Sequence, residues 1–290
     1  MSSPVRKAVI LAAGFGTRFL PVTKALPKEM LPIFDRPALQ YVVEEAVSAG
    51  LREIIIVTAA GKTAIEDYFD HAYDLEQFLM NKRNESALAE VRRPALLADI
   101  AYVRQKERLG VGHAVLCARS LVGNEPFALF FPDDVIFSEK PAIGQLLHVF
   151  QERGESVLAV ERTPRDEISH YGVIDARQAG LRLHQLLGLV EKPSPQDAPS
   201  DLAIVGRYIL TPQIFERLAE TLPHPSGEIQ LTDGLARLLE HERVYAYEYM
   251  GERHDTGRPL GLLKASISEA LRRPDAADGL SSYLRGLDLS

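Results

Sequence analysis

The sequence is poor in cysteine, with Cys117 as the single example among 290 residues. One cysteine cannot form a disulfide bond within the chain, which is typical of a reducing compartment and predicts a cytoplasmic location. Its neighbours, HAVLCARSLV, have a helical pattern, so Cys117 is interpreted as a small core residue rather than a catalytic thiol. No pairing of serine or cysteine with histidine has a useful context, so nothing favours a protein nucleophile.

Long apolar runs and an excess of positive charge are also missing. No stretch approaches the roughly 20 apolar residues of a membrane-spanning helix. The start, MSSPVRKAVILAAG, lacks the long apolar segment and cleavage site of a signal peptide. The formal net charge is −7, whereas a protein that neutralises a nucleic-acid backbone needs a basic surface. We therefore expect neither a membrane nor a nucleic acid among its partners.

The first half of the chain alternates apolar strands with helices. Helical periodicity occurs at 37–50, where Pro37 suits the first turn and Gly50 the C-terminal cap, and again at 113–122. The expected strands are 8–13, 53–58, 99–105 and 127–132. Near-continuous apolar strands separated by helices are typical of a mostly parallel sheet covered on both faces, so the sequence predicts an α/β fold.

The rest of the chain departs from this alternation. Residues 62–94 form a polar, helix-prone excursion. The end, 259–290, has the pattern of one amphipathic helix with a short tail, expected to pack on the parent domain or, alternatively, on a partner subunit. After Glu155 the pattern is mixed, with strands expected at 156–161, 171–175 and 202–210, and helices at 212–220 and 228–242.

A glycine turn, Gly14-Phe15-Gly16, follows the first strand directly. In an open parallel sheet, ligands bind beyond the carboxyl ends of the strands. Glycines there allow successive backbone N–H groups to surround an anion. The residues that follow add a hydroxyl and cationic donors suited to phosphate: Thr17, Arg18 and Lys28.

Two familiar phosphate-binding motifs do not fit this turn. The dinucleotide fingerprint needs a third glycine where this chain has Phe19, and it needs a helix at once, whereas Pro21 follows. The kinase-type phosphate loop needs Gly-Lys-Ser/Thr, which is absent from the turn. Taken alone, GFGTR fits a structural turn with solvated cations as well as it fits an anion site.

The block LAAGFGTRFLPVTKALPKEMLPIFDRPALQY resembles the signature of the sugar-nucleotide nucleotidyltransferases, Gly-x-Gly-Thr-Arg-x-x-Pro followed by Pro-Lys-x-x-Leu-Pro. Four further motifs occur in the order of that family: GVGHA (110–114), FFPDD (130–134), VEKP (190–193) and HDTG (254–257). Together the five motifs cover the chain from Lys7 to about Leu263. LAAG, the excursion, GHAVLCA and FFPDD resemble the uridylyl branch of the family rather than the thymidylyl branch.

This resemblance implies a Rossmann-like fold, with a mostly parallel mixed sheet, helices on both faces, a smaller sugar-binding part and a C-terminal helix. It implies a catalytic domain over 1–258 and a helix and tail over 259–290, with a possible contact to another subunit of a homodimer or homotetramer. The implied reaction joins UTP and glucose 1-phosphate into UDP-glucose and pyrophosphate, with Mg²⁺ as the cofactor.

The resemblance assigns the catalytic and metal-binding roles to five side chains. Asp133 and Asp255 match the family's metal ligands, and carboxylates suit a hard cation such as Mg²⁺. Arg18 and Lys28 would clamp the triphosphate and the leaving pyrophosphate, and Lys192 would meet the phosphate of glucose 1-phosphate. A turn or a helix cap is the alternative role of both aspartates.

Sugar binding is assigned to Asp134, Gly172, Glu191 and Lys192. The Glu191 carboxylate would accept hydrogen bonds from glucose hydroxyls, and Gly172 would let the sugar approach the backbone. Each has a plainer alternative. Glu191 and Lys192 fit a surface ion pair, Gly172 fits a turn or bulge, and Asp134 fits a helix cap.

Nucleotide binding is assigned to the glycine turn and to a later loop. The Gln105 amide carries both donors and acceptors, so it can pair with the N3–H and a carbonyl of uracil. Glu29 matches a family position near the base and, as an equal alternative, orients Lys28. His113 is expected to be structural or near the nucleotide rather than a base. The remaining nucleotide-binding residues are Ala13, Gly14, Gly16, Thr17 and Gly110.

Three other functions compete with uridylyl transfer. A thymidylyltransferase that makes dTDP-glucose differs only in details of the motifs. A glycosyltransferase that consumes a UDP-sugar shares the Asp-Asp pair at a strand end, but it has no triphosphate to explain Arg18 and Lys28. A regulatory paralogue that binds a nucleotide sugar without catalysis would have no need of the complete set of cations and aspartates.

Overall fold

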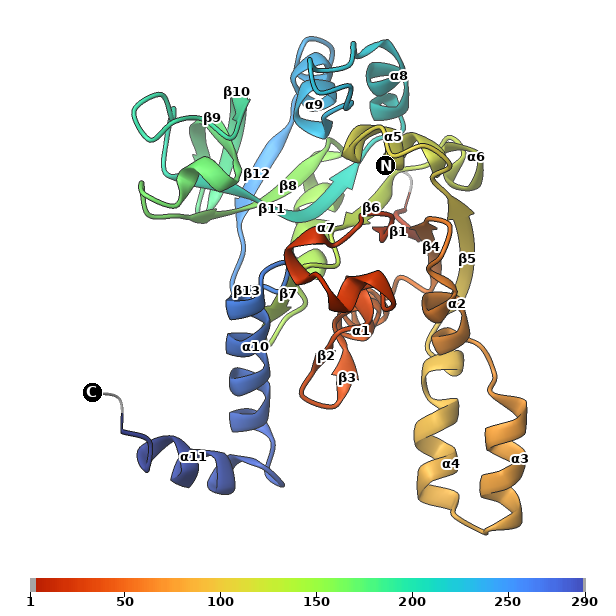
Figure 1. Cartoon of the computed structure of the whole chain (residues 1–290). Helices are drawn as coiled ribbons and strands as arrows, with labels where there is room; N and C mark the ends of the chain where they lie inside the picture. Colours follow the sequence, from red (N-terminus) through yellow and green to blue (C-terminus); the bar gives the residue numbers. More distant parts are fainter. Residues whose placement is uncertain (1–3, 289–290) are drawn as a thin grey trace.

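The computed structural model describes residues 4–288. Its centre is a nine-stranded mixed sheet with the strand order β5-β4-β1-β6-β11-β8-β12-β10-β9 (Figure 1). The first four strands run parallel, which confirms the α/β prediction. They are the four strands expected from the first half of the chain: β5 (Asp99–Arg104), β4 (Glu53–Thr58), β1 (Lys7–Leu11) and β6 (Phe127–Phe130).

The second half of the sheet is mainly antiparallel. β11 (Leu202–Leu210) is buried along its whole length and lies antiparallel to β6 and to β8 (Val157–Arg162). β12 (Tyr245–Glu248) runs parallel to β8, and β10 (Leu183–Glu191) and β9 (Gly172–Gly180) complete the sheet. β12 was not predicted, because its four residues, YAYE, are too few to show a reliable alternation.

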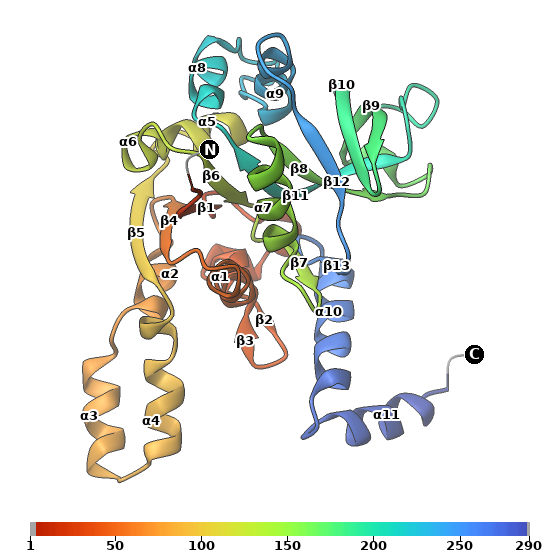
Figure 2. The same ribbon diagram turned by 180° about the vertical axis from the view of Figure 1, so that it is seen from behind.

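Helices cover both faces of the sheet, as predicted (Figures 1 and 2). β1 shows the division, since Ala8 and Ile10 join one apolar cluster whereas Val9 joins the other. The first face carries α1 (Ala38–Ser48), α2 (Thr63–Phe69) and α7 (Ala142–Arg153). The second carries α5 (Val111–Cys117), α6 (Arg119–Val122), α8 (Gln213–Glu220) and α9 (Leu231–Leu239).

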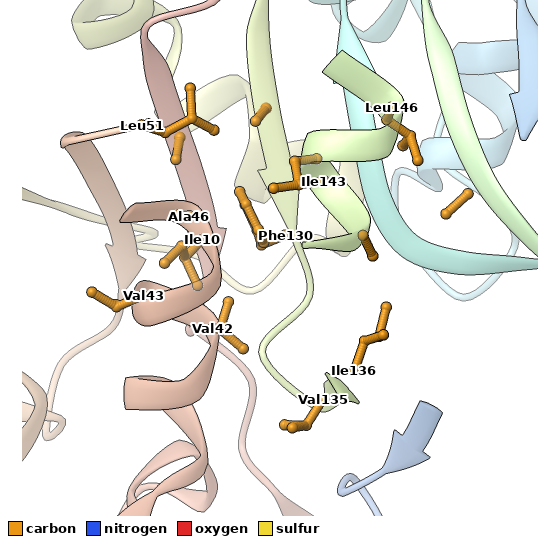
Figure 3. Close-up of a cluster of buried hydrophobic side chains, with 14 of the residues drawn as sticks. Ile10, Val42, Val43, Ala46, Leu51, Phe130, Val135, Ile136, Ile143 and Leu146 are labelled. Carbon is orange, nitrogen blue, oxygen red and sulfur yellow. The ribbon is translucent and has the colours of Figure 1, made fainter. Parts of the chain in front are cut away.

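Figure 3 shows part of the first cluster, where Val42 and Ala46 of α1 lie near Ile10 and Phe130 of the sheet. Two helices differ from expectation. The predicted helix 113–122 is divided into α5 and α6, and α7 was not predicted. These three helices pack apolar stripes against the sheet, and such packing supplies most of the stability of a short helix.

The excursion at 62–94 is helical, as predicted, and contains α2, α3 (Tyr73–Asn81) and α4 (Glu85–Arg92). α3 and α4 form a hairpin that projects from the body of the molecule (Figures 1 and 2). The Glu76 carboxylate of α3 accepts hydrogen bonds from Arg92 of α4 at 2.6 Å and contacts His71 at 2.8 Å. The Arg92 contact joins the two helices of the hairpin, and the His71 contact ties α3 to the segment that precedes it.

The C-terminal segment forms two helices, so the prediction of a single helix is wrong. α10 (Pro259–Arg272) ends at Arg273, which is extended, and α11 (Ala277–Arg285) begins after a turn. Pro274 explains the break, because the residue before a proline avoids helical geometry. Two short pairs complete the fold: β2 (Pro32–Ile33) with β3 (Arg36–Pro37), and β7 (Asp134–Phe137) with β13 (Glu252–Asp255). No helix within residues 4–288 has the length and apolar character needed to cross a membrane.

Candidate active site

Two adjoining cavities lie beyond the carboxyl ends of the parallel strands. The first, called the glycine-loop cavity, is lined by seven predicted residues: Ala13, Gly14, Gly16, Thr17, Lys28, Gln105 and Gly110. The second, called the sheet cavity, is lined by six others: Arg18, Asp134, Gly172, Glu191, Lys192 and Asp255. Asp133 lines both cavities, together with Val111 and Phe131. Among the predicted site residues, Glu29 alone lines neither of them.

The glycine loop packs closely against the segment that carries Lys28. Gly16 has a φ of 69°, in the left-handed region that favours glycine. A Cβ at position 16 would lie 3.0 Å from the Cβ of Lys28 and 3.1 Å from Cγ2 of Thr23, and the Thr23 hydroxyl donates to the Gly16 carbonyl at 2.8 Å. A larger residue at position 16 would therefore push Lys28 away from the loop.

Lys28 and Asp133 form an ion pair at the wall shared by the two cavities, with Nζ 2.6 Å from Oδ2. Burial by itself would lower the pKa of Lys28, but the Asp133 and Glu29 carboxylates together outweigh burial and raise it. Burial would likewise raise the pKa of Asp133, and the Lys28 ammonium instead holds it below its ordinary value. Both groups are therefore charged at neutral pH.

The second predicted aspartate reaches Asp133 through the β7–β13 pair, in which Asp255 is the register partner of Asp134. Thr256, the next residue, donates from its backbone N–H at 2.7 Å and from its hydroxyl at 2.9 Å to the Asp133 carbonyl. A Cβ at Gly257 would lie within 3.0 Å of carboxylate oxygens of both Asp133 and Asp255. The structure thus brings the two predicted metal ligands together, although 122 positions separate them in the sequence.

The surroundings of the two carboxylates suit a hard divalent cation. Burial raises the pKa of Asp255 first, and the negative charge of the neighbouring Asp134 carboxylate raises it further. Residues 4–288 contain no group of three or more His, Cys, Asp or Glu side chains arranged to hold a metal ion. Mg²⁺ usually keeps several waters and takes one or two carboxylates together with substrate phosphates, so two aspartates are enough for it.

Asp134 is held by the protein itself. Its carboxylate accepts a hydrogen bond from the Gly206 backbone N–H at 2.8 Å and from Nε of Arg253 at 2.6 Å. Arg253 also donates to Glu161 at 2.7 Å, and its guanidinium lies 4.7 Å from the ring centre of Tyr171. The sequence analysis missed Arg253, although it directly precedes the HDTG motif.

Glu191, Lys192 and Gly172 meet at the edge of the sheet cavity. The Lys192 ammonium lies 2.7 Å from the Glu191 carboxylate, and Lys192 has a left-handed φ of 46°. Such a φ is uncommon outside glycine and is often found at functional sites. A Cβ at Gly172 would lie 3.1 Å from side-chain methyls of Ile204 and Thr232, so a side chain there would have to displace them by a few tenths of an ångström.

Gln105 lies in the glycine-loop cavity with its amide partly engaged. Its Nε2 donates to the Gly110 carbonyl at 3.0 Å and lies 3.1 Å from Nδ1 of His113. His113 therefore has a structural contact, in line with the expectation that it is not a base. Gly110 has a φ of 92°, and a Cβ there would lie 2.7 Å from the Ile229 carbonyl.

Glu29 is buried, 2% exposed, and pairs with a lysine that was not predicted. Nζ of Lys62 lies 2.8 and 2.9 Å from its two carboxylate oxygens and donates to the Ala12 carbonyl at 2.7 Å. Burial lowers the pKa of Lys62, which the Glu29 charge opposes. Glu29 thus supports the start of the glycine loop through Lys62, and no hydrogen bond joins it to Lys28 in the part of the chain described here.

Arg108 is a second unpredicted cation at the glycine-loop cavity. Its Nε donates to the Ala13 carbonyl at 3.1 Å, and its guanidinium lies 3.6 Å from the ring centre of Phe15. No motif marks Arg108 in the sequence, where it looks like an ordinary loop charge. Its guanidinium adds positive charge beside the predicted nucleotide site.

Comparisons with known proteins give the family of the chain. A family model described as nucleotidyl transferase matches residues 7–270. A UTP–glucose-1-phosphate uridylyltransferase of Bacillus subtilis (strain 168) is 47% identical over 283 residues, covering 98% of this chain and 97% of the relative. A solved structure of UDP-glucose pyrophosphorylase complexed with UDP-glucose has a TM-score of 0.85 at 42% identity, covering 93% of this chain and 100% of the other. A UTP-bound UGPase from Acinetobacter baumannii has a TM-score of 0.91 at 38% identity, covering 98% and 100%.

Proposed function

This chain belongs to the nucleotidyl transferase family, and we propose that it makes UDP-glucose and pyrophosphate from UTP and glucose 1-phosphate. The proposal rests on the position of Asp133, which lines two adjoining cavities. Each cavity is also lined by basic side chains that would suit an anionic substrate. The named function of the uridylyltransferase relatives supports this choice of substrates.

UTP is proposed to occupy the glycine-loop cavity. The backbone of Ala13 and Gly14, with Gln105 and Gly110, would face the uracil, because an amide and backbone groups can match its donor and acceptors. A base with the wrong pattern would leave these polar groups unpaired, which is how such sites discriminate strongly. Backbone N–H groups at Gly16 and the Thr17 hydroxyl would face the phosphates.

Glucose 1-phosphate is proposed to occupy the sheet cavity. Glu191 would accept hydrogen bonds from sugar hydroxyls, and Lys192 would pair with the sugar phosphate. Gly172 would keep the wall open, since a Cβ there would already crowd Ile204. Asp134 would act through its bond to Arg253, which shapes the same cavity.

The reaction would take place where the cavities meet. A phosphate oxygen of glucose 1-phosphate attacks the α-phosphorus of UTP, and the bond from that phosphorus to the bridging oxygen of the β-phosphate breaks, releasing pyrophosphate. Lys28 lines the glycine-loop cavity and Arg18 lines the adjoining sheet cavity, and both would neutralise the charge that develops on the triphosphate. Positioning and cations carry the catalysis, since a phosphate monoester is already an adequate nucleophile.

Asp133 and Asp255 are proposed to hold Mg²⁺, because the space beside Gly257 lies between their carboxylates. The bound cation would draw phosphate oxygens together and reduce the repulsion at the α-phosphorus. Lys28 pairs with the same Asp133 carboxylate, so with Mg²⁺ bound there its ammonium would be available to the triphosphate.

Pyrophosphate release tests the proposal directly. Release should require UTP, glucose 1-phosphate and Mg²⁺ together, and dTTP should replace UTP poorly. The Asp133→Ala variant should lose turnover and keep its fold, whereas Asp201→Ala, which removes an exposed partner of Arg162, should behave as the unaltered chain. Release with dTTP as good as with UTP would favour the thymidylyl alternative. Consumption of UDP-glucose without pyrophosphate would favour a glycosyltransferase, and binding without release would favour a regulatory paralogue.

A cytoplasmic location and a homodimeric or homotetrameric state also belong to the proposal. The single cysteine supports the first. Exposed apolar side chains on the C-terminal helices support the second, among them Leu263 and Tyr283. The division into a catalytic domain, 1–258, and a C-terminal part, 259–290, remains a prediction.

A further inference from the structure

We propose that Arg207 and Glu45 form a buried ion pair that positions the loop 131–134, and with it Asp133, for uridylyl transfer. Neither residue lines the glycine-loop cavity or the sheet cavity, so neither would touch a substrate there. Their role is to fix the backbone from which the Asp133 carboxylate projects. This inference rests on the proposed function, because that function gives Asp133 its task.

Arg207 lies on β11 and is fully buried, with 0% exposure. Its guanidinium donates to the carbonyl of Asp134 at 2.6 Å, of Phe131 at 3.2 Å and of Gly206 at 2.9 Å. The guanidinium also donates to Oε2 of Glu45 at 2.7 and 3.0 Å, and its Nε lies 3.1 Å from Oε1. All five N–H donors of an arginine are thus used, and two of the carbonyls belong to the two ends of the loop.

Glu45 connects this arginine to the helical layer. It lies on α1, and its Oε1 also accepts a hydrogen bond from the backbone N–H of Ile143 in the first turn of α7 at 3.0 Å. That N–H has no partner within its own helix, as is general for a helix N-terminus. The ion pair therefore joins α1, α7, β11 and the loop in one polar cluster.

The packing around the loop holds its two ends. Figure 3 shows Phe130 and Val135, which flank the loop, in the same apolar cluster as Ile143. β11 approaches closely, because a Cβ at Gly206 would lie 2.5 Å from the Cβ of Phe131. On the opposite side, Thr256 donates twice to the Asp133 carbonyl. The carbonyls of residues 131, 133 and 134 are all engaged, so the backbone around the Asp133 side chain is held on both sides.

Stability alone does not explain a buried ion pair at this place. Removing two charges from water is expensive, and well-packed apolar residues of similar volume often replace such a pair without loss. An apolar pair, however, donates no hydrogen bonds to the loop carbonyls, and lysine has three donors without a planar fork. Arg207 can donate to a carboxylate and to three backbone carbonyls at the same time, which neither replacement could do.

The decisive variant is the double replacement Glu45→Met/Arg207→Met, which leaves no uncompensated charge. UTP binding is measured by calorimetry with and without Mg²⁺, and pyrophosphate release is followed as Mg²⁺ is varied. We expect the gain in UTP affinity that Mg²⁺ provides, or kcat, to fall by roughly 10- to 100-fold, the range typical of residues that support metal ligands. UTP affinity without Mg²⁺ should stay within about twofold, as for distant independent sites.

A folded double variant that keeps both the Mg²⁺-dependent gain and kcat within about twofold overturns the positioning role. If that variant does not fold, Arg207→Lys decides with the same measurements, because it keeps the charge beside Glu45 and loses the fork. Val122→Ala, a buried change at the opposite end of the sheet, controls for lost stability and should leave both readouts unchanged. A wild-type chain that binds no UTP and releases no pyrophosphate overturns the proposed function instead.

Discussion

Asp133, which lines both cavities, has a positive and a negative side chain beside it. The Lys28 ammonium lies 2.6 Å from its Oδ2, and the Asp255 carboxylate faces it across Gly257. Asp255 has a cationic partner of its own, since Nε of Arg258 lies 3.5 Å from its carboxylate. If a divalent cation were bound beside both aspartates, Lys28 and Arg258 would be available to pair with phosphate. The proposed site therefore offers acidic groups to a metal ion and basic groups to phosphate.

Lys192 is the residue proposed to bind the phosphate of glucose 1-phosphate. In the Lys192→Ala variant, KM for glucose 1-phosphate should rise by roughly tenfold or more, since a charge-assisted hydrogen bond to phosphate is worth about 1.5–3 kcal/mol. KM for UTP should change much less. Initial rates of pyrophosphate release at varied concentrations of each substrate provide the measurement, with Lys82→Ala on the α3–α4 hairpin as the control. A rise confined to the KM for UTP would reverse the assignment of the two cavities.

At the scale of elements, the β7–β13 pair brings a distant loop to the end of the parallel sheet. Asp255 follows from the register of that pair, and Thr256 then bonds to the Asp133 carbonyl. The two metal ligands therefore depend on pairing between strands that are far apart in the chain. Gly257 has to be small, because both carboxylates border the place that a side chain would take.

The Gly257→Ala variant should therefore lose Mg²⁺-dependent turnover. A Cβ 2.9 Å from the Asp133 Oδ2 would displace a carboxylate, and a fall in kcat of roughly 10- to 100-fold is expected for such a disturbance near a metal ligand. Gly279→Ala on α11 is the matched control, since nothing lies within 4 Å of its Cβ position. It should leave kcat unchanged and add up to about 1 kcal/mol of helix stability. Equal kcat values for the two variants would contradict the crowding argument.

The α3–α4 hairpin should show a pH dependence of its own. Hydrogen bonds from Arg92 and then His71 hold the pKa of Glu76 below its ordinary value of 4.5. A carboxyl with a depressed pKa in the folded state stabilises that state fully above its unfolded pKa, and this contribution is lost as the pH falls through the folded value. The protection of the α3 and α4 amides against exchange, taken relative to the intrinsic exchange rate at each pH, should fall below about pH 4.5 in the unaltered chain.

In the Glu76→Gln variant the hairpin amides should be less protected already at pH 7, and the further loss of protection at acidic pH should shrink. The exposed residue Glu90, also on the hairpin, supplies the control through Glu90→Gln. An unchanged exchange rate in Glu76→Gln at pH 7 would show that the Arg92 contact does not join the two helices energetically.

At the scale of the whole molecule, the α3–α4 hairpin and the C-terminal helices extend from the sheet as separate projections (Figures 1 and 2). α10 is anchored, since Ala265 lies in the core and Arg273 pairs with Asp35 at 2.8 Å. In α11, by contrast, no side chain of the described range Ala277–Arg285 is buried. A helix with an exposed apolar stripe and little contact with its own domain is a candidate for subunit contact.

We therefore expect a homodimer or homotetramer in solution, measurable by light scattering coupled to size-exclusion chromatography. The double variant Leu271→Ser/Tyr283→Ser should shift the mass toward the monomer, because both side chains are exposed and apolar. Leu181→Ser, at the β9–β10 turn and 89% exposed, should not. A monomeric unaltered chain, or an assembly indifferent to the C-terminal changes, would remove this role from the two helices.

The chain's local patterns were enough to predict the parallel half of the sheet and the glycine loop. Buried strands such as 53–58 are apolar in themselves, and the turn 14–16 follows one of them directly. Motifs pointed to Lys28 and Asp133, and the structure pairs them in the glycine-loop cavity, with Asp133 also lining the sheet cavity. Such features depend on residues close together in the chain, so the sequence by itself determined them.

Tertiary structure alone decided which charges meet. Arg253 reaches Asp134 across 119 positions, Lys62 reaches Glu29 across 33, and Arg207 reaches Glu45 across 162. Each of these cations looks like any other charge in its local segment, because its partner is set by strand register and helix packing. Periodicity and motifs describe neighbours along the chain, whereas a buried ion pair is a property of two surfaces that meet only after the chain has folded.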